Sequence, residues 1–130
     1  MQVTAIIAEW NPLHRGHLLP VQAARQQGAT HIVAILSGNF VQRGEPALCP
    51  WQYRAAAALS SGVDLVLLLP LPYAVSTAQH FAGGAVASLA ALGAVDSLIF
   101  GSECGELAAL RSVAAALDSP DLPAALAPHL

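Results

Sequence analysis

The chain has 130 residues, enough for one domain with a single core and too few for two ordinary domains. Apolar residues make up 55% of it and charged residues 10%, which excludes an intrinsically disordered chain. All five basic residues are arginine, and the net charge of -3 excludes a nucleic-acid surface that works through bulk positive charge.

Residues 65–95 carry no Asp, Glu, Lys or Arg, so a membrane span has to be considered. Prolines at 70 and 72 and a glycine pair at 83 and 84 interrupt this stretch, which fits a buried strand, a loop and a packed helix better than a span. The N-terminus has no basic leader and reaches Glu9 almost at once. We expect a cytoplasmic protein with no membrane partner, and the two isolated cysteines fit a reducing compartment.

The first third of the chain predicts a strand, a helix and a second strand. Residues 3–8 form an apolar, β-branched run that ends in the turn Glu9-Trp10-Asn11-Pro12. Apolar residues at helical spacing follow from 16 to 27, and Gly28 can end that helix. Residues 31–36 repeat the strand pattern. Such a βαβ unit has a right-handed crossover in nearly all known cases.

The rest of the chain predicts two more strands separated by helices. Residues 40–50 lack periodicity and are expected to form a loop. We expect a helix over 51–61, a strand covered on both faces over 63–69, a helix over 79–92, a strand over 97–100 and a helix over 107–117. One domain is expected over residues 1–118, followed by a proline-rich tail over 119–130.

This alternation predicts an α/β fold, an open and doubly wound parallel sheet of four or five strands with helices on both faces. A barrel needs roughly twice this length. With the strand order 3-2-1-4, the switch point lies between the first and fourth strands. The loops at 9–17 and 101–103 are then expected to face one crevice beyond the carboxyl ends of the strands.

The motif His14-Arg15-Gly16-His17 stands where the first strand is followed by the first helix. Histidines three residues apart project toward one face of the opening turn, and a helix N-terminus adds unpaired N–H groups. Gly16 removes a side chain that would block the approach of a nucleotide. We expect an ATP phosphate site, in which His14 and His17 stabilise developing charge as the α-phosphate is attacked and pyrophosphate leaves.

Simpler interpretations of these residues stay open. The two histidines also suit a helix cap, whereas a zinc site lacks a third ligand at metal spacing, so we expect no metal ligands. Glu9 suits a nucleotide-side carboxylate or a loop acceptor, and Glu103 suits a site residue or a helix N-cap. The remaining candidates suit structural roles in turns and at the starts of strands and helices: His31, Gly38, Gly44, Asp64, His80 and Asp96.

Four segments carry a more particular signature. They are Glu9-Trp10-Asn11-Pro12-Leu13-His14-Arg15-Gly16-His17, Ser37-Gly38-Asn39-Phe40-Val41-Gln42-Arg43-Gly44-Glu45-Pro46, Gly62-Val63-Asp64-Leu65-Val66 and Phe100-Gly101-Ser102-Glu103. In this order and spacing they resemble the tRNA(Met) cytidine acetate ligase family, a branch of the H-x-G-H nucleotidyltransferases with a Rossmann-like, HUP-type fold. The resemblance spans residues 3–103, and Trp10 and Leu13 depart mildly from a pattern that more often has Tyr and Phe.

The resemblance implies an enzyme that activates acetate with ATP to acetyl-adenylate and passes the acetyl group to N4 of the wobble cytidine of elongator tRNA(Met). ATP chemistry of this kind usually runs on a magnesium complex. The resemblance gives His14 and His17 catalytic roles and places the ATP contacts in one continuous segment and one later glycine: Ile7, Ala8, Glu9, Trp10, Asn11, Pro12, Leu13, His14, Arg15, Gly16, His17, Leu18, Leu19, Pro20 and Gly101. We add the hypothesis that a loop contacts phosphate or RNA through Ser37, Gly38, Asn39 and Arg43.

Members of the family are much longer than this chain. The resemblance therefore makes residues 1–118 an ATP-binding domain and residues 119–130 a tail or the start of a missing C-terminal region. That region is expected to hold a second nucleotide-binding segment and most of the tRNA-binding surface. Two other functions stay open: an adenylyltransferase that moves AMP onto a small phosphorylated acceptor, and a non-catalytic ATP-binding module.

Overall fold

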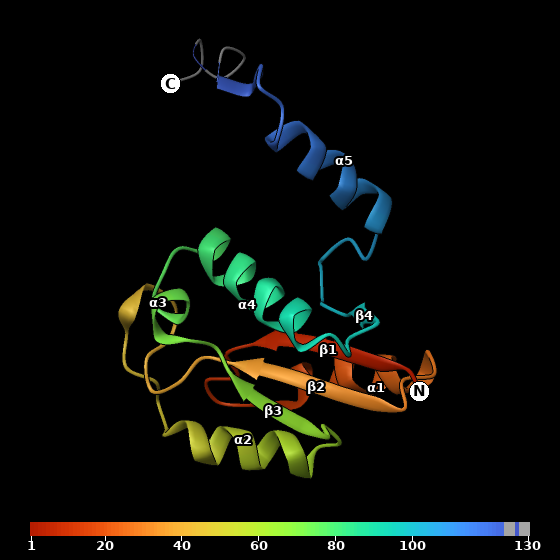
Figure 1. Cartoon of the computed structure of the whole chain (residues 1–130), viewed down its shortest axis with the longest axis vertical. Helices are drawn as coiled ribbons and strands as arrows, with labels where there is room; N and C mark the ends of the chain where they lie inside the picture. The colour runs from red at the N-terminus through yellow and green to blue at the C-terminus, as the bar shows by residue number, and fades with distance from the viewer. Residues whose placement is uncertain (124–126, 128–130) are drawn as a thin grey trace. The chain divides into compact units, whose positions relative to one another are not determined.

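The computed structural model describes residues 1–123 and 127 and divides into two compact units, Met1–Phe100 and Gly101–Leu130. The first unit is built on a parallel sheet (Figure 1). Its strands are β1 (Val3–Ala8), β2 (His31–Leu36), β3 (Leu65–Leu68) and β4 (Ser97–Leu98), in the order β3-β2-β1-β4. This order confirms the predicted doubly wound sheet and places its switch point between β1 and β4.

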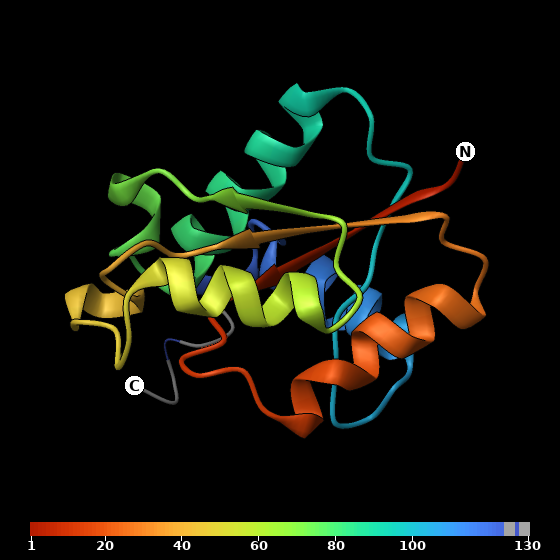
Figure 2. The ribbon, with the colours of Figure 1, turned by 90° about the horizontal axis from the view of Figure 1, so that it is seen from below.

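Helices cover both faces of the sheet, as Figure 2 shows. On one face, α1 (Leu18–Gln26) and α2 (Trp51–Ser60) contribute Val21 and Ala58 to a core that includes Ile32. On the other face, α3 (Leu71–Ala74) and α4 (Ala78–Leu92) contribute a second set of apolar side chains, which pack on β1 and β2: Ala74, Phe81, Ala85 and Leu89. Each core removes apolar surface from water, which is the main favourable term in folding.

An aspartate precedes each of the two outer strands and accepts a hydrogen bond from the backbone of the neighbouring inner strand. Asp64 Oδ2 accepts a hydrogen bond from Ile32 N at 2.6 Å, and Asp96 Oδ2 accepts one from Val3 N at 2.7 Å. Each bond joins the start of an outer strand to the start of the inner strand beside it. The predicted structural role of these two aspartates is therefore confirmed.

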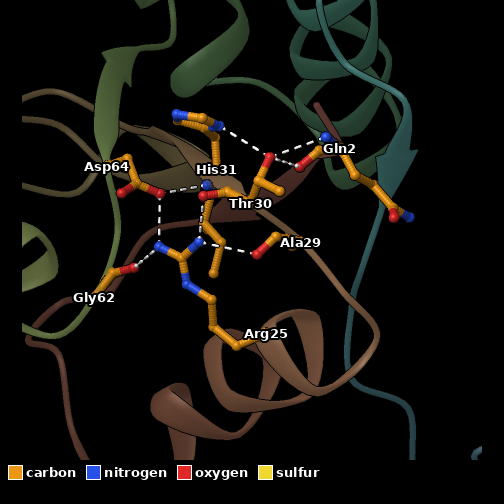
Figure 3. A network of polar contacts seen from close by, with 8 residues as sticks. Gln2, Arg25, Ala29, Thr30, His31, Gly62 and Asp64 are labelled. Atoms are coloured by element: carbon orange, nitrogen blue, oxygen red, sulfur yellow. Dashed lines mark hydrogen bonds and ion pairs between the residues drawn. The ribbon is translucent and has the colours of Figure 1, made fainter.

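Arg25 extends one of these contacts into a network at the amino ends of the strands (Figure 3). Its guanidinium donates to the carbonyl oxygens of Ala29, Thr30 and Gly62 at 3.0, 2.8 and 2.9 Å. Arg25 Nη2 also pairs with Asp64 Oδ2 at 2.7 Å. Partial burial acts to raise the pKa of Asp64, but the hydrogen bonds from Ile32 N and Arg25 outweigh it and hold that pKa below its ordinary value.

The substitution Asp64→Asn should lower the free energy of unfolding by about 1 kcal/mol at pH 7, since solvent screens this partly exposed ion pair. A carboxylate with a lowered pKa stabilises the fold above its ordinary pKa, and this contribution is lost as the pH falls through the lowered value. The free energies of unfolding of wild type and variant, measured in urea, should therefore converge only below about pH 4. Asp118→Asn, at an exposed carboxylate, is the control; identical pH profiles for the two variants would contradict this prediction.

The structure corrects several expected boundaries. The strand expected over 63–69 is shorter and is not covered on both faces, because β3 lies at the sheet edge and leaves Leu65 and Leu68 more than 40% exposed. The strand expected over 97–100 is only Ser97–Leu98. The helix expected from residue 16 begins with a 3-10 turn, η1 (Arg15–His17), and a short turn, η2 (Gln42–Gly44), lies in the expected 40–50 loop.

In the described part of the second unit, the helix α5 (Leu107–Leu117) lies at the predicted position. Glu106 occupies its N-cap, so the expected N-cap role of Glu103 is wrong. Gly101 and Glu103 belong to this unit, and the predicted crevice between their loop and residues 9–17 stays a prediction. The predicted tail over 119–130 lies partly outside the described residues. Within the described part of the chain, no helix is both long enough and apolar enough to cross a membrane.

Candidate functional site

The two histidines of the H-x-G-H motif lie together beyond the carboxyl end of β1, with His14 just before η1 and His17 as its last residue. His14 occupies the N-cap, and its Nδ1 accepts a hydrogen bond from Gly16 N at 3.1 Å. In return, His17 Nδ1 accepts one from His14 N at 3.2 Å. Their rings stack with centroids 3.6 Å apart and planes 25° from parallel. The turn is therefore a reciprocal cap made by two imidazoles. The capping interpretation of the two histidines is correct.

This cap determines what the histidines offer to a ligand. A neutral imidazole that accepts at Nδ1 carries its proton on Nε2, so both rings present Nε2–H donors. Burial, followed by the nearby charge of His14, lowers the pKa of His17, which favours its neutral form. Among residues 1–123 and 127, no group accepts a hydrogen bond from either Nε2. Two stacked rings thus hold two free donors of the kind that binds phosphate oxygens.

The structure explains the glycine at position 16 in a way that the sequence did not reveal. A Cβ atom at this position would lie 3.1 Å from His14 Cε1 and 3.2 Å from His14 Nδ1. Such contacts are tighter than ordinary van der Waals packing, so a side chain would push the His14 ring aside. Gly16 therefore preserves the stacked histidine pair whether or not a nucleotide also approaches it.

The rest of the predicted ATP-binding segment differs in exposure. Ile7 and Ala8 end β1 half-buried, while Trp10 is only 4% exposed and belongs to the core, with its ring centroid 6.5 Å from that of His17. Leu13 packs against the same core. Trp10 therefore offers almost no surface to a nucleotide. Arg15 is exposed and leaves its side chain accessible.

Two polar side chains of this segment bind the neighbouring loop. Glu9 Oε1 accepts a hydrogen bond from Gln42 N at 2.6 Å, and Asn11 Oδ1 accepts one from Leu48 N at 2.7 Å. The loop-acceptor role considered for Glu9 is thus present. The predicted contact of Asn11 with a nucleotide would be left to its amide nitrogen and backbone.

The four predicted residues of the loop after β2 have different surroundings. Ser37 is fully buried, and Asn39 Oδ1 accepts a hydrogen bond from Trp51 N at the start of α2. Arg43 is exposed and lines an open hollow of about 410 Å³ with residues 75–78. Gly44, at φ 83°, needs glycine for its turn, but Gly38 has an ordinary φ, and no described atom lies within 4 Å of the place a Cβ would occupy there. The turn explanation therefore holds for Gly44 and fails for Gly38.

Sequence reasoning missed Arg54, which is only 1% exposed. From α2 it reaches the residues that follow β1 and β2, and it donates from Nη1 to the Glu9 carbonyl at 2.6 Å. Arg54 Nη2 donates to the Ser37 carbonyl at 3.0 Å and also to the Gly38 carbonyl. Its position in the sequence held a signal: it is the single charged residue between Glu45 and Asp64. A lone charge in an alanine-rich, packed helix usually has a specific partner.

The chain is similar in sequence to a known family and to named proteins. The family model of the HIGH Nucleotidyl Transferases matches residues 1–127. A tRNA(Met) cytidine acetate ligase from Syntrophotalea carbinolica is 52% identical over 119 residues, which are 91% of this chain and 28% of that protein. The ligase of the same name from Exiguobacterium sibiricum is 55% identical over 109 residues, 82% of this chain and 28% of that protein.

Solved structures show the same likeness. A crystal structure of Thermotoga maritima TmcAL bound with alpha-thio ATP superposes with a TM-score of 0.85 at 44% identity, over 90% of this chain and 29% of that one. The apo form of the same protein gives a TM-score of 0.84. The chain thus spans 28% of the length of each of the two ligases named above.

Proposed function

Because the chain belongs to the HIGH nucleotidyl transferase family, we propose that it is the nucleotide-binding part of a tRNA(Met) cytidine acetate ligase. The single observation that carries this proposal is the stacked pair His14 and His17, with both Nε2–H donors free at the carboxyl end of β1. The names of the similar ligases and the alpha-thio ATP in the Thermotoga maritima structure support it.

In this proposal, ATP lies along residues 7–20, with its phosphates at the histidine turn. A carboxylate oxygen of acetate attacks the α-phosphorus, the bond to the bridging oxygen breaks, and pyrophosphate leaves. The Nε2–H groups of His14 and His17 donate to oxygens that gain negative charge in this step. Fixed donors that follow developing charge are usually worth more than a general base in such a reaction.

The second step moves the acetyl group. The N4 amine of the wobble cytidine of elongator tRNA(Met) attacks the acetyl carbonyl, AMP leaves, and the amine loses a proton. The net charge of -3 and the five arginines supply little attraction for RNA, so we assign the tRNA contacts mainly to the remainder of the longer protein. Magnesium on the phosphates is part of the proposal, since a divalent ion would share the charge of the triphosphate.

The proposal is tested in two stages with the 130-residue chain and a full-length relative. Calorimetric titration should show that ATP binds to the chain, and a folded chain that takes up no ATP would refute the proposal. Exchange of labelled pyrophosphate into ATP should then depend on acetate in the full-length relative. Exchange that instead requires a small phosphorylated acceptor would favour an adenylyltransferase, and binding without any exchange would favour a non-catalytic module.

A further inference from the structure

Arg54 joins the two strand ends that border the proposed ATP site. Its guanidinium is fully buried and donates to the carbonyl oxygens of Glu9, Ser37 and Gly38, and its Nε donates to the Cys49 carbonyl at 3.3 Å. Glu9 follows β1 and the serine and glycine follow β2, so one side chain sets the spacing between these two segments. No substitution by a neutral side chain of this size provides as many donors.

The positive charge of Arg54 has no carboxylate in contact with it. In the part of the chain that the structure describes, the one ion pair is Arg25 with Asp64, at the other end of the strands. The Glu9 carboxylate accepts its hydrogen bond from Gln42 N instead. Burying a cation among carbonyl groups is costly, and burial lowers the pKa of Arg54 accordingly. The charge of the nearby Glu9 carboxylate acts to raise the pKa of Arg54, but Glu9 makes no ion pair with the guanidinium, so the field of this buried cation can also act on an anionic ligand beside the two segments.

We propose that Arg54 is a positioning residue for the phosphates of ATP, a role that rests on the proposed function above. It turns the carbonyl oxygens of Glu9 and Gly38 toward itself, where their partial negative charge does not repel phosphate. Its own charge lies beneath the same two segments and attracts the polyphosphate in a region of low dielectric constant. Gly38, with open space around its Cα and no backbone need for glycine, leaves this surface free of a side chain.

If the charge of Arg54 acts on phosphate, the loss of affinity on its removal should grow with the number of phosphates in the ligand. A purely structural role predicts no such dependence. Calorimetry should compare ATP, ADP, AMP and adenosine with the wild-type chain, Arg54→Gln and Arg54→Lys at one ionic strength. We expect Arg54→Gln to weaken the binding of ATP by about tenfold more than the binding of adenosine, with intermediate effects on ADP and AMP. Arg54→Lys keeps the charge and should keep the ratio of ATP to adenosine affinity within about twofold of wild type.

Arg25→Gln is the matched control, because Arg25 also binds three carbonyl oxygens but lies at the amino ends of the strands. It should lower thermal stability and leave the ATP to adenosine ratio unchanged. Equal weakening of all four ligands by Arg54→Gln would overturn the proposal. If that variant does not fold, a tenfold fall of the ratio in Arg54→Lys would overturn it too. A wild-type chain that binds no ATP would instead refute the proposed function itself.

Discussion

Replacing His14 by asparagine should weaken ATP binding by roughly ten- to hundredfold while the melting temperature stays the same or rises. An Asn Oδ1 can accept the hydrogen bond from Gly16 N that His14 Nδ1 accepts now, and asparagine is among the best N-cap residues. The variant loses the Nε2–H donor, and a hydrogen bond to a charged oxygen contributes about 1.5–3 kcal/mol. Thermal unfolding and calorimetric titration of the same samples measure both effects.

Two further variants separate capping from phosphate binding. His14→Ala removes the cap and the donor, so both stability and ATP affinity should fall. His31→Asn changes an exposed histidine at the start of β2, on the far side from the motif, and should leave ATP affinity unchanged. ATP affinity of wild-type strength in His14→Asn would show that the imidazole serves only as a cap.

The second large effect is expected for Gly84→Ala, which should lower the free energy of unfolding by about 2–3 kcal/mol. Alanine normally stabilises a helix relative to glycine by about 1 kcal/mol. At this position, however, a Cβ would lie 2.2 Å from Tyr73 Cγ and 2.6 Å from Tyr73 Cβ. These atoms are close to the α3 backbone and cannot swing away, so α3 and α4 would have to move apart.

Gly83 provides the matched control for this prediction. It precedes Gly84 in α4 and is exposed, and no described atom lies within 4 Å of the position of its Cβ. Gly83→Ala should therefore stabilise the chain by about 0.5–1 kcal/mol. Urea unfolding of the two alanine variants should give changes of opposite sign. Equal stability for both would show that the contact with Tyr73 does not limit the packing of α3 on α4.

The fold was predictable largely because its signals are local. The strands over 3–8 and 31–36 and the helix over 107–117 agree with the structure at both ends, since apolar runs and helical spacing report on a few consecutive residues. The expected burial of β3 was wrong because its continuous apolar run suggested cover on both faces, although the expected order 3-2-1-4 already placed this strand at the sheet edge. The short helix α3 was missed because Pro70 precedes it and Pro72 lies in its first turn, and two prolines so close together suggested a loop.

The histidine motif was found from spacing and context, but its geometry was not. Spacing placed His14 and His17 on one turn, yet the reciprocal cap that leaves both Nε2–H groups free is a matter of side-chain rotamers. The reason for glycine at position 16 likewise depends on where the His14 ring lies. Both features follow from contacts that no single-residue preference encodes.

By itself, the sequence determined the order of the elements, the parallel sheet they form and the turn that carries the two histidines. All three depend on patterns within short stretches of chain. Only the tertiary structure decided that Arg54 joins the ends of β1 and β2 and that Gly84 must admit Tyr73. These contacts bring together residues from separate helices and strands, so they exist only once the sheet and its helices have packed.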